Sequence, residues 1–317
     1  MVMNEQAEFG SVLALEGWLK FNEYKWGVKS LRVRLTGNDK ESLPAIEAVL
    51  YLDKKGRIVQ PPLNPYLPVI FYPTPTEKKP RLYRQWMNLS KLLADEFIKR
   101  GVRGAIVFPP EVVDIRQWQW HGFVGEVRYT FYIELPYDIE IAESSVRTKI
   151  RKAERNGFTC EMATKQALFE VIECLAETET RQNFSHRLTT RDLEIAIELL
   201  GEDTFRAYLC RASSGEVASA QIVISVPGMR SIGWVAGTKH KFLSSGATQY
   251  LIWYTLNDIS QQAAIGYDFC GANLPTVSAA KADWGGTLTP YYVVRPFNLR
   301  TVGSWLLKKF AQMRKIR

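Results

Sequence analysis

A regular helical spacing of apolar residues opens the second half of the chain. Val146, Ile150 and Ala153 recur at intervals of four and three, Ser144-Ser145 supplies an N-cap, and Gly157 follows as a stop signal. This spacing predicts an amphipathic helix. Its polar side is basic and carries Arg147, Lys149, Arg151, Lys152 and Arg155.

Three β-rich runs follow at residues 204–212, 217–226 and 230–236. Turn-prone segments, Ser213–Glu216 and Pro227-Gly228, separate them, which predicts an antiparallel meander. The apolar spacing elsewhere predicts a strand at 158–162, helices over 168–175, 189–201 and 246–263, a short strand at Tyr267 and a last strand at 291–295, before a basic terminal helix.

The first half shows related elements in a similar order. Strands are expected at 31–35, 47–52 and 68–72, a helix at 82–100, and strands at 104–108 and 129–135. We therefore expect an α/β (α+β) fold of two tandem domains, each with a mixed, mostly antiparallel sheet flanked by helices. The predicted division is 1–140 and 141–317.

Composition limits the class of protein. With 46% hydrophobic and 23% charged residues in 317, the chain is of ordinary globular character and long enough for two domains. It has no apolar run of membrane-spanning length, and its N-terminus lacks the order of a secretory signal. The four cysteines form no C-x-x-C pair and are interpreted as reduced core residues. We therefore expect a cytoplasmic protein.

Charge points to an anionic partner. The net charge is +8, and basic residues gather at 147–155 and again at 308–317. Such clusters favour nucleic acid, phosphorylated small molecules or the inner membrane leaflet. A merely solvated basic surface is the alternative.

Lys281 is the candidate catalytic residue. The segment Gly266–Gly271 is typical of a short strand that ends in glycine, and a loop is expected to bring Lys281 just ahead of Gly285-Gly286. A lysine held there can stabilise the charge that develops on the oxygen of an attacked carbonyl. The alternative is an ordinary surface lysine.

Other candidate sites are less specific. The small residues Ser244, Ser245, Gly246 and Ala247 precede a predicted helix, whose free amides favour a phosphate or carboxylate. Arg181, Lys20 and Lys25 are possible anion-binding cations, with dipole complementation as the other explanation for Arg181. The histidines show no metal-binding spacing, so no stable metal is expected, and Walker and dinucleotide motifs are absent.

Three segments together resemble the tandem-GNAT FemABX group of the GNAT acyltransferase superfamily. They are Arg147–Gly157, Tyr267–Gly271 and Lys281–Gly286. Members of that group transfer an aminoacyl unit from charged tRNA to an amine of a peptidoglycan precursor, and relatives use acyl-CoA or serve polysaccharide biosynthesis.

The resemblance also implies roles for single residues. Lys281 matches the lysine that stabilises the carbonyl oxygen, Arg181 the arginine that grips the acceptor's phosphates, and Lys20 or Lys25 a lysine with the same task. The chain departs from the pattern at Ala280, where an aromatic residue is common, and lacks the coiled-coil arm of some members. Its CoA pyrophosphate loop is reduced to Ser244–Ala247.

The expected function is transfer of an acyl or aminoacyl group to an amine of a phosphorylated cell-envelope precursor. Aminoacyl-tRNA or acyl-CoA would be the donor substrate, without a tightly bound cofactor, and peripheral contact with the inner membrane is possible. The competing hypothesis is a non-catalytic GNAT-like protein that binds RNA or an anionic membrane through its basic segments.

Overall fold

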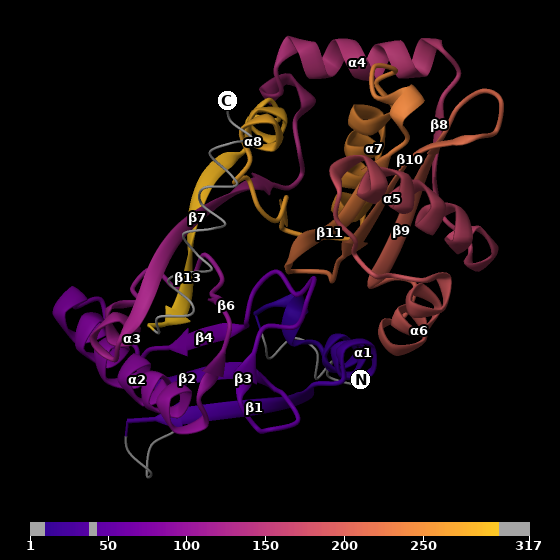
Figure 1. Ribbon diagram of the computed structural model, residues 1–317. Helices are drawn as coiled ribbons and strands as arrows, with labels where there is room; N and C mark the ends of the chain where they lie inside the picture. Colours follow the sequence, from indigo (N-terminus) through magenta and orange to yellow (C-terminus); the bar gives the residue numbers. More distant parts are fainter. Residues whose placement is uncertain (1–9, 38–42, 298–317) are drawn as a thin grey trace, which may run out of the picture. The chain divides into compact units, whose positions relative to one another are not determined.

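The computed structural model describes residues 10–37 and 43–297, and they form two compact units (Figure 1). Of these residues, unit 1 comprises 10–25 and 129–289, and unit 2 comprises 26–37, 43–128 and 290–297. Two strands, β7 (Phe123–Glu134) and β13 (Thr287–Pro296), run from one unit into the other.

Unit 1 is built on a mixed sheet with strand order β7-β12-β11-β10-β9-β8. The meander is antiparallel, as predicted, whereas β11 and β12 run parallel. Its remaining strands are β8 (Thr159–Met162), β9 (Phe205–Arg211), β10 (Val217–Ile224), β11 (Arg230–Thr238) and β12 (Gly266–Asp268).

Helices α4 and α7 share one core cluster with this sheet. Val146 and Ile150 of α4 meet Leu251 and Leu256 of α7 there. The unit contains α1 (Glu16–Trp26), α4 (Ser144–Arg155), α5 (Leu168–Gln182), α6 (Thr190–Leu200), α7 (Ala247–Gln261), α8 (Pro275–Ala282) and the short 3-10 turns η2 (Val12–Ala14), η3 (Ile139–Ile141), η4 (Lys165–Ala167) and η5 (His240–Phe242).

Strands β11 and β12 part soon after they meet. Their pairing covers only Arg230–Ile232 on β11 and Gly266–Asp268 on β12. On its other side β11 stays paired with β10, with a register shift that leaves Trp234 as an extra residue. Among the residues that the structure describes, no strand pairs with Gly233–Thr238 on the side of β12, and the sheet opens there.

Unit 2 contains a second mixed sheet of order β1-β2-β3-β5, with β4 also paired to β2. Leu89, Leu93 and Phe97 of α2 are fully buried, and the Phe97 ring packs edge-on against Trp118 and at a tilt against Phe108. The elements are β1 (Lys29–Thr36), β2 (Ala45–Leu52), β3 (Ile58–Val59), β4 (Val69–Tyr72), α2 (Lys79–Arg100), β5 (Val102–Arg103), β6 (Ile106–Val107) and α3 (Arg116–Trp120).

The N-terminal helix explains why the units differ from the division at residue 140. Trp18 and Phe21 of α1 pack edge-on against Trp234 of β11, with ring centroids 5.3 and 5.7 Å apart. Lys25 also pairs with Asp192 of α6 at 2.7 Å. Residues 10–25 thus complete the core of unit 1, although they stand first in the sequence.

Most predicted elements are present, and the mixed α/β class is confirmed. Helices α1, α3 and α8 were not predicted, and Lys281 lies on α8 rather than in a loop. Pro275 at the first position of α8 fits a helix start. Proline lacks a backbone N–H, and an N–H at this position would have no acceptor within the helix. The predicted terminal helix and the cluster at 308–317 lie outside the described residues.

Two further observations concern the cysteines and membrane-spanning helices. All four cysteines are free, and Cys174 and Cys210 are buried. Among the described residues, no helix combines the length and apolar character that crossing a membrane requires.

We predict that Gly246→Ala destabilises unit 1 strongly. Gly246 has φ +93°, and a Cβ there would lie 2.0 Å from the Lys149 carbonyl oxygen on α4. Strain plus overpacking should lower the free energy of unfolding by about 3 kcal/mol. Gly215 also has a positive φ but open space around it, so Gly215→Ala should cost only about 1 kcal/mol. Urea unfolding measures both; equal losses would contradict the close packing of α4 on this loop.

Candidate functional site

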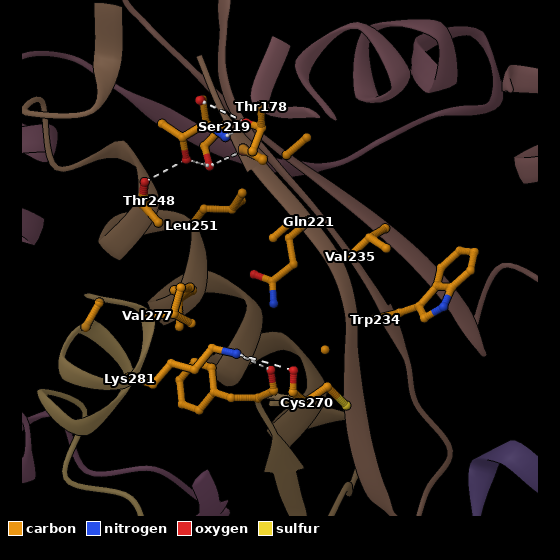
Figure 2. Close-up of a pocket in the computed structure, with 18 of the residues that line it drawn as sticks. Thr178, Ser219, Gln221, Trp234, Val235, Thr248, Leu251, Cys270, Val277 and Lys281 are labelled. Atoms are coloured by element: carbon orange, nitrogen blue, oxygen red, sulfur yellow. Dashed lines mark hydrogen bonds between the residues drawn. The ribbon is translucent and has the colours of Figure 1, made fainter. Parts of the chain in front are cut away.

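A cavity of about 590 Å³ occupies the opening beside β11 in unit 1 (Figure 2). Strands β10, β11 and β12, helices α5, α7 and α8, and the segment after α5 supply its walls. The lining includes Lys281 and Arg181, the two predicted residues of unit 1 with the clearest roles.

Lys281 lies at one end of this cavity with its ammonium held by backbone oxygens. Its Nζ donates to the carbonyls of Phe269 and Gly271 at 2.6 Å each and reaches that of Cys270 at 3.5 Å (Figure 2). Burial lowers the pKa of Lys281, and the nearby Cys270 and Asp268 oppose this shift. The lysine is therefore a partly desolvated cation with one weakly used N–H.

The three carbonyls converge because the chain turns sharply after β12. Cys270 has a φ of +51°, in the left-handed region that side chains disfavour. Asp268 holds this turn by accepting hydrogen bonds from the Cys270 amide at 2.7 Å and from the Thr130 hydroxyl at 2.6 Å. The turn is thus fixed by buried hydrogen bonds before any ligand binds.

Hydroxyl groups line the opposite end. Ser219, Thr238 and Thr248 form a chain with oxygen separations of 2.9 and 2.7 Å (Figure 2). Arg181, in the last turn of α5, donates to the Thr238 carbonyl at 2.9 Å. No carboxylate pairs with Arg181 within the part of the chain that the structure describes. This end of the cavity is cationic and rich in donors.

The predicted phosphate loop does not line the cavity. Gly246 is buried against α4, Lys152 donates to the Ser244 carbonyl at 2.8 Å, and the Ser245 hydroxyl accepts from the Ala247 amide at 3.1 Å. Its flanking residues Leu243 and Thr248 do line it. Helix α4 packs against this loop at Gly246, whereas Ser244 is exposed.

The two lysines near the N-terminus also lie outside the lining residues. Lys20 is exposed and pairs with Glu16 at 3.7 Å, as expected of neighbouring charges on a helix surface. Lys25 is mostly buried on Asp192. Both belong to unit 1 rather than to the first predicted domain.

Most polar residues of the lining were not predicted from the sequence, and three of them bear on the chemistry. His186 was set aside for lack of a metal motif, yet it lines the cavity with its Nδ1 2.7 Å from Glu179. Gln221 and Tyr267 meet through the Gln221 amide and the Tyr267 hydroxyl. The signal for Gln221 was present: Ser219 and Gln221 are polar at a spacing of two in the otherwise apolar run 217–224. The described residues contain no cluster suited to a metal ion.

Residues 142–276 match a protein family described as the acetyltransferase (GNAT) domain. This part of the chain is a GNAT domain. It contains the opened β11, the cavity walls from β10 to β12, and α7. Lys281 lies just beyond the matched residues.

Solved structures extend the likeness to both units. FemX has a TM-score of 0.64 at 17% identity, covering 90% of this chain and 92% of its own. L-PGS from Bacillus licheniformis has a TM-score of 0.54 at 13% identity, covering 90% of this chain and 88% of its own. The third structure is a C-terminal domain from Agrobacterium fabrum that is attributed to a lysylphosphatidylglycerol synthetase. Its TM-score is 0.53 at 10% sequence identity, and the match covers 87% of each chain. No curated protein matches the chain significantly in sequence. At these identities the likeness establishes a FemX-like fold and nothing further.

We predict that Lys281 loses its proton at a lower pH than an exposed lysine does. Its folded pKa is lowered by burial, so the unfolded chain binds more protons between the two pKa values, and stability should rise with pH across that interval. NMR titration of ¹⁵N-lysine side chains measures this, with exposed Lys165 as the reference. A Lys281 pKa at or above that of Lys165 would contradict the desolvated position.

Proposed function

We propose that this chain is an acyltransferase that moves an acyl or aminoacyl group to an amine, with the reaction in the cavity of unit 1. The observation that carries the proposal is the position of Lys281, a desolvated cation at the place where β11 and β12 part. The GNAT domain and the FemX-like fold support this class of reaction.

Lys281 would act on the carbonyl oxygen of the donor. That oxygen replaces the Cys270 carbonyl, 3.5 Å away, as the acceptor of the third ammonium N–H. The two shorter hydrogen bonds, to Phe269 and Gly271, keep the ammonium in position. The amine attacks the carbonyl carbon, the carbonyl π electrons move to the oxygen, and the C–O or C–S bond to the leaving group then breaks. The amine's proton passes to the departing oxygen or sulfur, so no protein base is required. One preorganised donor contributes about 3 kcal/mol to such a step.

The acceptor that we propose is an amine of a phosphorylated cell-envelope precursor, reached at the cytoplasmic face of the membrane. Arg181 supports the phosphate part, because its guanidinium is anchored by Thr238 and retains further N–H groups for an anion. Between the two donors, aminoacyl-tRNA is favoured over acyl-CoA. The loop 244–247 uses its Ala247 amide on the Ser245 hydroxyl and does not line the cavity, whereas CoA would need open amides there.

The basic face of α4 supports a second candidate function, namely non-catalytic binding of RNA or an anionic membrane. Lys149, Arg151, Lys152 and Arg155 are exposed, and no carboxylate pairs with them within residues 10–37 and 43–297. This alternative predicts salt-sensitive binding that does not change when Lys281 is replaced.

Transfer assays separate these functions. The protein is incubated with aminoacyl-tRNA or acetyl-CoA and with amine acceptors that carry or lack a diphosphate, and product is measured by mass spectrometry. The proposal expects product with at least one donor and a preference for phosphorylated acceptors. Absence of transfer from both donors, with RNA or vesicle binding intact, would favour the alternative.

We predict that Lys281→Met lowers kcat/KM at least 100-fold, because the developing oxyanion loses its cationic donor. The loss should appear mainly in kcat. Lys165→Met removes an exposed lysine of the same unit and should leave turnover within about twofold. Circular dichroism of both variants reports the fold. A folded Lys281→Met protein with native turnover would refute the role of Lys281.

We also predict that Arg181→Gln raises KM for a phosphorylated acceptor about tenfold and leaves kcat nearly unchanged. Loss of one charge-assisted contact corresponds to about 1.5 kcal/mol. Arg191→Gln, at an exposed arginine paired with Glu194 and Glu198, is the matched control and should have no effect. Equal effects with acceptors that lack phosphate would argue against phosphate binding by Arg181.

A further inference from the structure

Gln221 is a buried polar residue with one unused hydrogen-bonding atom. It lies in the middle of β10 and is 4% exposed. Its Nε2 donates to the Tyr267 hydroxyl, whereas its Oε1 is buried and accepts no hydrogen bond. A buried acceptor without a partner destabilises the folded protein, so such groups are rare and call for an explanation.

The position of Gln221 connects this unused atom with the cavity. Several buried side-chain atoms in the described part of the chain lack partners, but among them only Oε1 of Gln221 belongs to a residue that lines the cavity. Figure 2 shows the Gln221 amide projecting into the space between Leu251, Val235 and Lys281. It therefore lies on the route between the hydroxyl-rich end and the ammonium of Lys281.

In the structure the amide nitrogen of Gln221 faces the Tyr267 hydroxyl, which leaves Oε1 as the atom without a partner. The Tyr267 ring is 1% exposed, and its hydroxyl occupies space that a side chain at position 233 would need: a Cβ on Gly233 would lie 2.1 Å from it. The Gln221 Nε2 is bound to this immobile hydroxyl. The carbonyl side of the amide is thus held ready for a donor that the protein itself does not provide.

We propose that Gln221 Oε1 accepts a hydrogen bond from an N–H group of the substrate and so positions that nitrogen beside the carbonyl held by Lys281. The inference rests on the proposed function and deepens it by naming the ligand chemistry of this wall. Two sources share that chemistry: the attacking amine of the acceptor, and the α-amine of an aminoacyl donor. A neutral amide oxygen takes no proton at neutral pH, so Gln221 is a positioning residue and not a base.

The first test compares stability with activity. Gln221→Met keeps the length of the side chain and removes both the unused acceptor and the hydrogen bond to the Tyr267 hydroxyl, two changes with opposite effects on stability. Tm should therefore change little, while kcat/KM should fall about tenfold or more. Gln221→Glu retains an acceptor oxygen and should recover part of the activity. Thr255 Oγ1 on α7 is likewise buried without a partner but does not line the cavity, so Thr255→Val should leave turnover within twofold. A native kcat/KM in a folded Gln221→Met protein would overturn the proposal.

A second comparison identifies which nitrogen is bound. Donors with and without an α-amine are each assayed with native protein and Gln221→Met. If the donor's amine is the partner, the variant loses activity only with the amine-bearing donor. If the acceptor's amine is the partner, the loss is the same with both donors. No loss with either would exclude both sources.

A binding measurement separates this inference from the proposed function. The side-chain ¹⁵N amide of Gln221 is followed by NMR during addition of glycinamide, assigned by its disappearance in Gln221→Met. A saturable shift supports the N–H site even if no transfer is found, in which case only the proposed function fails. Transfer activity together with an unshifted Gln221 resonance and native-like Gln221→Met kinetics would instead remove the inference alone.

Discussion

The parting of β11 and β12 is the constraint on which the remaining features of unit 1 depend. Hydrogen bonding between them stops after three residue pairs, and the register shift at Trp234 turns β11 away while β10 continues to support it. The packing of Trp18 and Phe21 on Trp234 helps to hold this bend. The opened sheet thus gives the cavity a backbone wall that is held in place by β10 on its other side.

The charge inside this opening is arranged in advance. Lys281 is desolvated, but the Phe269 and Gly271 carbonyls compensate the lost water, and Asp268 keeps that turn in its left-handed conformation. At the far end, Arg181 is oriented by Thr238. The two cations thus occupy opposite ends of one cavity, with the Gln221 amide between them. Such fixed polar groups stabilise developing charge without reorganising during the reaction.

The sequence was a good guide to elements with a clear period and a poor guide to elements defined by contacts. The meander and the helices α4 and α7 were predicted because apolar spacing and turn residues mark them. Helix α1 was missed, because its apolar residues are spread around the helix and its packing on β11 is a long-range contact. The same applies to the cavity: motifs pointed to Lys281 and Arg181, which line it, whereas the packing of Gly246 against α4 and the pairing of Gln221 with Tyr267 depend on tertiary neighbours.

The most direct test of the account is a crystal structure of the protein with a non-hydrolysable acyl-donor analogue that retains the carbonyl. The account predicts the analogue between β11 and β12, with its carbonyl oxygen within hydrogen-bonding distance, about 3 Å, of Lys281 Nζ. An analogue bound elsewhere, for example on the basic face of α4, with Lys281 still held only by the three backbone carbonyls, would contradict it.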